Sequence, residues 1–357
     1  MPRRTDRTYA EIDVRALTHN VEFFRKECNG KKIIAILKAS CYGHGDRLAR
    51  YLSDKIDCIG VATVEEGCRI RAFCNNIPIL ILGFVPRGSI IKAIKSDLTL
   101  AVFSERYARI VDEEGLKAGK AIPVHIKVDT GMGRIGFSPE DKEEFSSLIA
   151  LPNLEIRGIF SHYASSEEEN PFTFRTQTEK FLSAVEFFEK RGVKFDFVHI
   201  ANTAAAHLDS VGNAVRVGYG LYGYGRKGVL PVLSWKARVA RVRIAMPSER
   251  IGYSGSYLVK EKMLVATISA GYGDGYPRSL SNAGKVLYNG RFLPITGRIC
   301  MDMFMVDATG SSIKEGDEVV LIGKSGDSEI NAENLGFGYE VLCRISQRVK
   351  RYYISSR

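Results

Sequence analysis

Seven side chains of kinds that carry out chemistry follow short apolar runs of the sequence or lie within one. They are Lys38, Asp129, Arg134, His162, Asn202, Thr203 and Arg216. An amine adds to carbonyl groups, an imidazole moves protons, and a guanidinium binds carboxylates or phosphates through paired donors. If the apolar runs are parallel strands of a closed barrel, these side chains meet at its C-terminal face, where barrel enzymes hold their active sites.

Lys38 directly follows the apolar run 33–37, so we expect its amine at the inside end of a buried strand. Burial disfavours the charged ammonium and favours the neutral amine that forms an imine with a carbonyl cofactor. Taken alone, the same lysine also fits a surface position at a strand end. Its meaning therefore depends on what surrounds it.

The elements that position these residues alternate between strands and helices. Eight apolar runs are predicted to be strands, at 33–37, 58–62, 79–82, 98–103, 124–128, 156–160, 197–200 and 214–217. Stretches between them have helical periodicity, as at 13–26, 65–73 and 177–191. Continuous apolar runs are typical of parallel strands buried on both faces, so the pattern predicts an α/β fold with a (β/α)8 barrel of the TIM type.

After Tyr224 the pattern changes to alternating segments such as 264–268 and 318–322, with glycine-rich turns and few helical stretches. This alternation predicts a C-terminal β-rich domain. We expect the barrel to cover residues 10–235 and the β domain residues 236–357, joined by the N-terminal segment 1–9.

Composition narrows the function classes. The net charge is +10, but lysine and arginine are dispersed through the 357 residues, which disfavours a nucleic-acid partner. The seven cysteines form no C-x-x-C pair, so neither a disulfide framework nor a metal site is expected. The N-terminus, Met1 to Asp6, lacks the apolar core of a secretion signal, and no apolar run is long enough to span a membrane. We therefore expect a cytoplasmic protein without membrane contact.

The segment 218–223 reads G-Y-G-L-Y-G and satisfies the dinucleotide pattern G-x-G-x-x-G. It opens no clear helix and comes after several βα units rather than in the first. A glycine-rich turn with available backbone N–H groups binds a single phosphate equally well. We therefore interpret it as a phosphate site rather than a dinucleotide site.

The segment 35–45, A-I-L-K-A-S-C-Y-G-H-G, closely resembles the cofactor-attachment motif of the alanine racemase family. The resemblance continues in order through most of the chain, at 127–136, 161–164, 199–205, 216–223, 252–255, 271–278, 297–302 and 339–340. It implies that Lys38 carries pyridoxal 5'-phosphate as a Schiff base. It also implies a barrel followed by a β domain, and a homodimer whose active sites are shared between chains. The implied reaction interconverts L-alanine and D-alanine, which supplies D-alanine for cell-wall peptidoglycan.

Racemisation removes a proton from one face of the α-carbon and delivers one to the other, so two acid/base groups are expected. The resemblance assigns these roles to Lys38 and Tyr253, the latter supplied by the partner chain. It places Arg216 against the pyridine nitrogen. A guanidinium cannot accept a proton, so Arg216 would keep that nitrogen unprotonated.

The remaining roles also follow from the resemblance. Arg134 would contact the cofactor's phenolic oxygen and the substrate carboxylate, held in place by Lys127, a lysine often carbamylated in relatives. His162 would lie near the cofactor ring. A buried histidine whose ring nitrogens are hydrogen-bonded within the core fits the sequence almost as well. The cofactor would also be bound by Tyr42, Asn202, Thr203, Gly218, Tyr219 and Tyr339. Tyr272 and Met301 would come from the second subunit to narrow the entrance and bind the substrate carboxylate.

Three alternatives stay open. Serine racemases share this architecture, although the bulk of Tyr339 beside the phosphate favours alanine over serine. Decarboxylases that use the same cofactor and barrel are disfavoured, because an arginine rather than an acidic residue faces the pyridine nitrogen. A cofactor-binding barrel without turnover would lack the β domain and any equivalent of Tyr253.

Overall fold

A computed structural model of the chain describes residues 5–74, 76–165, 170–208 and 211–355, so residues 1–4 of the charged N-terminal segment lie outside it. The chain forms two compact units. The barrel unit comprises Leu17–Cys41 and Asp46–Leu230, and the β unit comprises Met1–Ala16, Tyr42–Gly45 and Pro231–Arg357.

The barrel unit is built on an eight-stranded sheet in the order β8-β7-β6-β5-β4-β3-β2-β9, with every strand parallel to its neighbours. The strands are β2 (Lys32–Ile36), β3 (Cys58–Val61), β4 (Ile79–Ile81), β5 (Thr99–Val102), β6 (Ile122–Lys127), β7 (Leu154–Phe160), β8 (Phe197–His199) and β9 (Ala214–Val217). A bridge between His199 and Gly212 approaches the gap between β8 and β9, which leaves the barrel nearly closed. All eight predicted strands are confirmed, with ends that differ by a few residues.

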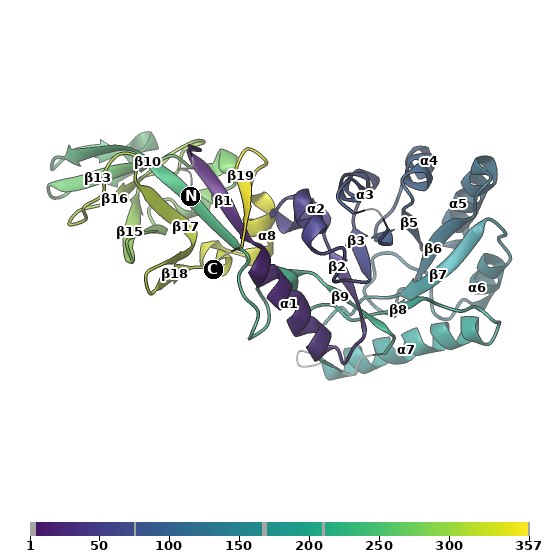
Figure 1. Ribbon diagram of the computed structural model, residues 1–357. Helices are drawn as coiled ribbons and strands as arrows, with labels where there is room; N and C mark the ends of the chain where they lie inside the picture. Colours follow the sequence, from purple (N-terminus) through teal and green to yellow (C-terminus); the bar gives the residue numbers. More distant parts are fainter. Residues whose placement is uncertain (1–4, 75, 166–169, 209–210, 356–357) are drawn as a thin grey trace. The chain divides into compact units, whose positions relative to one another are not determined.

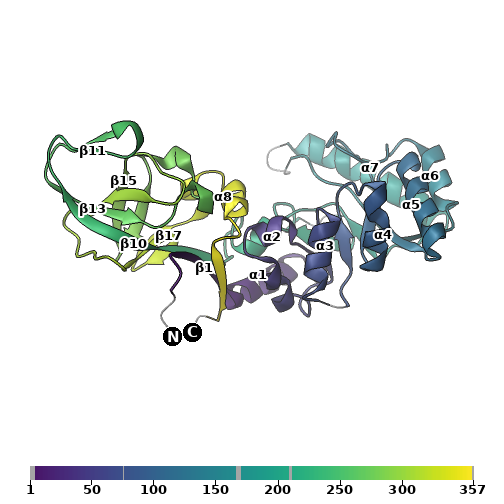
Figure 2. The same cartoon turned by 90° about the horizontal axis from the view of Figure 1, so that it is seen from above.

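Helices run along the outside of these strands (Figures 1 and 2). They are α1 (Val14–Glu27), α3 (Val64–Arg71), α4 (Arg87–Lys95), α5 (Glu105–Ala118), α6 (Lys142–Ile149) and α7 (Pro171–Glu189), with the short α2 (Lys38–Tyr42) after β2. Local sequence sets their ends. Ser104 accepts a hydrogen bond from the N–H of Tyr107 where α5 begins, and Gly119 ends α5 with a φ of 61°. The predicted (β/α)8 barrel is confirmed.

The β unit contains a nine-stranded sheet in the order β18-β17-β14-β15-β16-β13-β10-β1-β19, with a two-stranded β11-β12 ribbon. Its strands are β1 (Thr8–Asp13), β10 (Leu233–Ala245), β11 (Arg250–Ile251), β12 (Tyr257–Leu258), β13 (Met263–Ile268), β14 (Lys285–Tyr288), β15 (Arg291–Thr296), β16 (Phe304–Asp307), β17 (Glu318–Ser325), β18 (Ser328–Ile330) and β19 (Lys350–Ile354), with α8 (Gly338–Arg344) before the last. The long strand β10 alternates buried and partly exposed residues over 233–239, which places one face against the core. The predicted β-rich region is confirmed.

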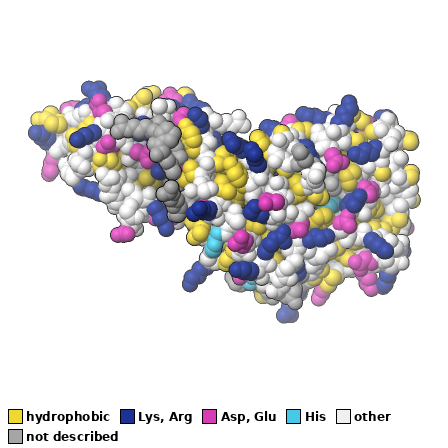
Figure 3. All heavy atoms as spheres, viewed as in Figure 1, with side chains coloured by type: hydrophobic (Ala, Val, Ile, Leu, Met, Phe, Trp, Pro, Cys, Tyr) yellow, Lys and Arg dark blue, Asp and Glu magenta, His cyan; other side chains and the backbone are white. Residues whose placement is uncertain are grey.

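On the face of the molecule that Figure 3 shows, charged side chains of both signs are spread out rather than gathered in one basic patch. Figure 3 shows lysine and arginine interspersed with acidic side chains on the side in view. None of the helices in the described part of the chain is long and apolar enough to cross a bilayer.

Candidate active site

The chain leaves β2 through an unusual turn that carries Lys38. Ala39, Ser40 and Cys41 have φ values of 51–54° with similar ψ values, and Tyr42 has a φ of 50°. Left-handed backbone costs a residue other than glycine roughly 1–2 kcal/mol, so four in succession form a strained segment. Such strain is found where the position of a side chain matters. Lys38 itself is exposed rather than buried, because β2 ends at Ile36 and the chain turns at the barrel mouth.

Arg216 on β9 contacts polar groups at the ends of two other strands, β7 and β8. One guanidinium nitrogen, Nη1, lies 2.7 Å from Nδ1 of His199 and 3.1 Å from the carbonyl oxygen of that residue. The other, Nη2, lies 2.9 Å from Nδ1 of His162 and donates to the carbonyl oxygens of Ser161 and Ile200 at 2.7 and 2.8 Å. Arg216 is buried, and none of its hydrogen-bond partners among the described residues is a carboxylate. Burial and the charge of Arg134 lower the pKa of its guanidinium to about 9, which leaves it charged at neutral pH.

The donors of Arg216 fix the tautomers of the histidines around it. A guanidinium only donates hydrogen bonds, so Nδ1 of both His162 and His199 must accept and each ring carries its proton on Nε2. Nε2 of His199 lies 3.1 Å from Nδ1 of His125, and it is therefore the donor in that contact. Burial first, then the charge of Arg216, lowers the pKa of His162 to about 3 and that of His199 well below its ordinary value. The site thus holds neutral imidazoles around one cation.

Lys127 is the last residue of β6, the strand beside β7. Its side chain is buried, and Nζ donates to the carbonyl oxygen of Val128 at 2.7 Å. Burial lowers the pKa of the amine to about 7, against the opposing charge of Asp129 and with further lowering by Arg216 and Arg134. An amine with such a pKa is about half neutral at pH 7, and its neutral form can react with carbon dioxide. Carbamylation, which the family resemblance implies for Lys127, is therefore chemically possible at this amine.

Asp129 organises the loop that presents Arg134. Its Oδ1 accepts from the N–H groups of Gly131, Met132 and Gly133 at 2.9–3.1 Å, and its Oδ2 accepts from the N–H of Arg134 at 3.1 Å. Burial alone would raise the pKa of this carboxyl, but the N–H donors and the Lys127 charge outweigh it and lower the pKa. The side chain of Arg134 is exposed, so its guanidinium is accessible to an anionic ligand.

Thr203 is joined to the glycine-rich turn after β9. Its Oγ1 accepts from the N–H of Gly218 at 3.0 Å and more distantly from that of Gly220 at 3.5 Å. Accepting these bonds leaves the hydroxyl proton of Thr203 able to point toward an anion. A Cβ on Gly220 would come within 2.8 Å of the Thr203 methyl group and closer still to Phe24, so only glycine fits this turn. Tyr219 is buried and stacks on Tyr224 at 5.0 Å.

Asn202 has a local role in this structure. Its Oδ1 accepts from the N–H groups of Ala204 and Ala205 at 3.1 and 3.2 Å, which shapes the turn after β8. This turn carries the neighbouring Thr203.

The β unit brings Tyr42 and Tyr339 together. Their ring centroids lie 6.0 Å apart, with Tyr42 buried and Tyr339 partly exposed at the start of α8. Burial first, then the neighbouring phenol, raises the pKa of Tyr42, and burial also raises that of Tyr339. Both hydroxyls therefore stay protonated, as donors to an anion must.

Three further expected site residues lie on exposed turns of the β unit. Tyr253 is 64 % exposed and follows Gly252, which has a φ of 78°. Tyr272 and Met301 are 42 % and 51 % exposed and lie on neighbouring loops, because the N–H of Tyr272 donates to the carbonyl oxygen of Cys300 at 3.1 Å. In the chain taken alone these side chains point to solvent.

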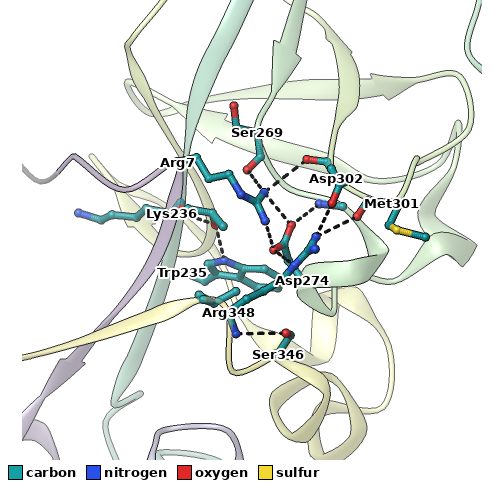
Figure 4. Close-up of polar contacts among 12 residues, drawn as sticks. Arg7, Trp235, Lys236, Ser269, Asp274, Met301, Asp302, Ser346 and Arg348 are labelled. Atoms are coloured by element: carbon teal, nitrogen blue, oxygen red, sulfur yellow. Dashed lines mark hydrogen bonds and ion pairs between the residues drawn. The ribbon is translucent and has the colours of Figure 1, made fainter.

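A buried carboxylate supports the loops of Tyr272 and Met301 from beneath (Figure 4). Asp274 is fully buried and contacts Nη2 of Arg7 at 2.5 Å and Nε of Arg348 at 2.9 Å. Its Oδ2 also accepts from the N–H of Gly271 at 2.9 Å, and Arg348 continues to Asp302 at 2.6 Å. Two arginines and two carboxylates thus link both loops to the rest of the β unit.

The sequence reasoning assigned no role to four residues that shape the site, although two of them, His199 and Asp274, lay within matched segments. The four residues are His125, His199, Asp274 and Glu66. Glu66 was detectable, because Thr63 and Glu66 have the T-x-x-E spacing of a helix start. The two histidines follow apolar strand residues and read as core residues until the contacts with Arg216 are seen. Asp274 contacts residues far along the chain, which no local pattern reveals.

Comparisons with known proteins cover both units. Residues 12–226 match the family model described as the alanine racemase N-terminal domain, and residues 232–353 match that of the alanine racemase C-terminal domain. The chain is 36% identical to the alanine racemase of Clostridium tetani, over 97% of this chain and 95% of that one.

Solved structures give the same result. The alanine racemase of Clostridium difficile 630 has a TM-score of 0.92 at 33% identity, covering 99% of this chain and 97% of that chain. The alanine racemase of Bartonella henselae, solved with covalently bound pyridoxal phosphate, has a TM-score of 0.85 at 30% identity, covering 98% of this chain and all of that chain.

Proposed function

Because the chain belongs to the alanine racemase family of isomerases, we propose that it interconverts L-alanine and D-alanine with pyridoxal 5'-phosphate as cofactor. The observation that carries the proposal is the pairing of β2 with β9, in which Ile34 lies opposite Arg216. This pairing sets the amine of Lys38 and the guanidinium of Arg216 at the ends of adjacent strands. An amine and a donor-only cation at one barrel mouth suit a carbonyl cofactor with a ring nitrogen.

The residues present fit such a cofactor. Lys38 has an exposed primary amine that would carry it covalently, and Arg216 is a buried cation whose partners are neutral. The turn at Gly218 and the hydroxyl of Thr203 offer donors for a phosphate. When bound, the cofactor withdraws electrons from the α-carbon of an amino acid and makes its α-proton removable.

Proton transfer would be divided between two side chains. Lys38 would take or give the proton on one face of the α-carbon, and Tyr253 of the partner subunit would act on the other face. The 64 % exposure of Tyr253 supports this division, because a side chain on an outward turn is available to another chain. We therefore include in the proposal a homodimer with shared active sites.

Arg216 would face the ring nitrogen as a hydrogen-bond donor. Because a guanidinium cannot accept a hydrogen bond from a protonated nitrogen, Arg216 would leave that nitrogen unprotonated. His162 would lie beside the same ring, with its Nε2 proton directed away from Arg216. Replacing Arg216 with glutamate would supply a group that can hold a proton, so we expect more side product from transamination. Unchanged racemisation and unchanged side-product yield in Arg216→Glu would contradict this role.

Two anionic groups would need binding sites, the cofactor phosphate and the substrate carboxylate. The phosphate would be held by Tyr42, Thr203, Tyr339 and the backbone of Gly218 and Tyr219, and Asn202 would be a further cofactor-binding residue. Arg134 would bind the substrate carboxylate, oriented by Lys127 in its carbamylated form, and Tyr272 and Met301 would complete the substrate pocket. The near-neutral pKa of Lys127 supports carbamylation, since only an uncharged amine reacts with carbon dioxide.

The test combines spectroscopy with loss of optical activity. The purified chain is incubated with pyridoxal 5'-phosphate, scanned for the absorbance of lysine-bound cofactor, and mixed with L-alanine while circular dichroism is followed. We expect the band and a decay of ellipticity to zero, with neither in Lys38→Ala. A band without decay on L-alanine or L-serine would overturn the enzymatic proposal.

Serine is the second substrate to compare, because it differs from alanine by one hydroxyl group. A pocket of this kind discriminates by about 1–3 kcal/mol. We expect kcat/KM for alanine to exceed that for serine by roughly 10-fold or more in one preparation.

Cytoplasmic supply of D-alanine for peptidoglycan is the role we propose for the product. Deletion of the gene should then make the cell depend on added D-alanine, and growth without D-alanine would contradict this role.

A further inference from the structure

Glu66 on α3 bridges the ends of two neighbouring barrel strands. Its Oε1 accepts from the N–H of Ala39 at 2.8 Å, and its Oε2 accepts from the N–H of Ala62, also at 2.8 Å. Ala39 directly follows Lys38 after β2, and Ala62 directly follows β3. One carboxylate therefore ties the first residue of the left-handed turn to the adjacent strand.

The turn needs an external contact of this kind. Four successive residues other than glycine hold φ values of 50–54°, a region that such residues adopt only when their surroundings determine it. Within the turn, the N–H of Cys41 donates to the carbonyl oxygen of Leu37 at 3.1 Å. Glu66 supplies an acceptor for the N–H of Ala39, at the point where the chain first enters the left-handed region.

We propose that Glu66 is a positioning residue that fixes this turn and thereby aims the amine of Lys38. The inference rests on the proposed role of Lys38 and deepens it. A carboxylate is suited to the task because both of its oxygens accept hydrogen bonds. Glutamine offers one acceptor and one donor, so it can serve only one of the two N–H groups, and alanine serves neither.

A purely local role in starting α3 is the competing explanation. The N–H of Glu66 donates to Oγ1 of Thr63 at 3.2 Å, so the start of α3 already has a capping side chain. Thr63→Ala removes that cap without touching the contact with Ala39. It therefore separates the stability of the helix from the position of the turn.

The experiment compares Glu66→Gln, Glu66→Ala, Thr63→Ala and the matched control Glu65→Gln. Glu65 lies beside Glu66 on the same helical turn, is exposed, and contacts Lys92 instead, at 3.4 Å. Amide hydrogen exchange of residues 39–42 is measured after cofactor removal, and cofactor dissociation, kcat and KM for alanine are measured in the loaded protein.

We expect Glu66→Ala to speed amide exchange at Ala39 by at least about 10-fold, because the N–H loses its acceptor. We also expect cofactor affinity and kcat to fall by a similar factor with less change in KM. Glu66→Gln should recover part of each effect, since it keeps one acceptor. Glu65→Gln should stay within about twofold of the parent chain.

Two results would overturn the inference. The first is unchanged exchange and unchanged kcat in both Glu66 variants, and the second is that Thr63→Ala reproduces their effects in full. Failure of the proposed function has a different signature, namely the absence of lysine-bound cofactor in the parent chain. The exchange of Ala39 in the cofactor-free chain still reports on the contact in that case. If Glu66→Ala does not fold, Glu66→Gln carries the comparison.

Discussion

The two units present their site residues in opposite ways. In the barrel unit, Arg216, His162 and Lys127 are joined by hydrogen bonds or charge, and most of the cluster is buried. In the β unit, Tyr253, Tyr272 and Met301 are exposed on turns, and ion pairs of Asp274 underlie the loops of Tyr272 and Met301. The proposed site residues of the barrel are thus part of its buried hydrogen-bond network. In the β unit, the residues proposed to meet a ligand are separate from those that hold the fold. Substitutions in the two units should therefore differ in how far they couple activity to stability.

The largest expected effect is on activity alone. Tyr253→Phe removes one hydroxyl from an exposed ring, so we expect kcat to fall about 10²- to 10⁴-fold, as for loss of a general acid or base. The melting temperature should change little, because an exposed hydroxyl contributes little to folding. Circular dichroism of alanine racemisation measures the fall in kcat, and a thermal melt measures the melting temperature. A melting temperature that falls in step with activity would remove the contrast between the units.

The next effect is on stability in the β unit. Asp274→Asn removes the charge of a fully buried side chain that binds two half-exposed arginines, so we expect a loss of about 2 kcal/mol in the free energy of unfolding. Asp302→Asn is the matched control, because Asp302 is 54 % exposed and its pair with Arg348 should contribute below about 1 kcal/mol. Urea denaturation of both variants measures the difference. Equal losses would show that burial does not set the strength of this network.

The third effect is the dependence of stability on pH in the barrel unit. Burial lowers the pKa of His125 to about 3, whereas an unfolded histidine titrates near 6.5. Between these values the unfolded chain binds more protons, so stability falls as the pH drops from about 6.5 toward 3. His125→Gln should reduce this slope by up to about 1.4 kcal/mol per pH unit, and the exposed His207→Gln serves as the control. Denaturation at several pH values tests it, and parallel slopes in parent and variant would refute it.

The smallest effect concerns the hydroxyl of Thr203. Thr203→Val leaves the N–H of Gly218 without its acceptor and should cost about 1 kcal/mol, whereas Thr203→Ser keeps the oxygen and should cost less. Thermal melts of the cofactor-free chain distinguish the two variants. If serine is more destabilising than valine, the methyl group rather than the hydrogen bond holds this turn.

The fold was predictable because continuous apolar runs mark the parallel strands, and alternation marks the β unit. The side chains that follow those strands were also predictable as a group. The contacts of Arg216 with His199 and of His199 with His125 were not, since they join strands that lie 17 and 74 residues apart in the chain. The exposure of Lys38 differed from expectation because a run of apolar residues does not reveal where the following turn leaves the barrel.

The left-handed turn after Lys38 has a consequence for protein engineering. Glycine usually weakens regular structure, but at Ser40 it would relieve a steric penalty and raise stability. By mirror symmetry, a D-amino acid would adopt this backbone more readily than the L-residue it replaces. Semisynthesis with D-alanine at position 39 would thus stiffen the segment beside the proposed attachment lysine without adding a single contact.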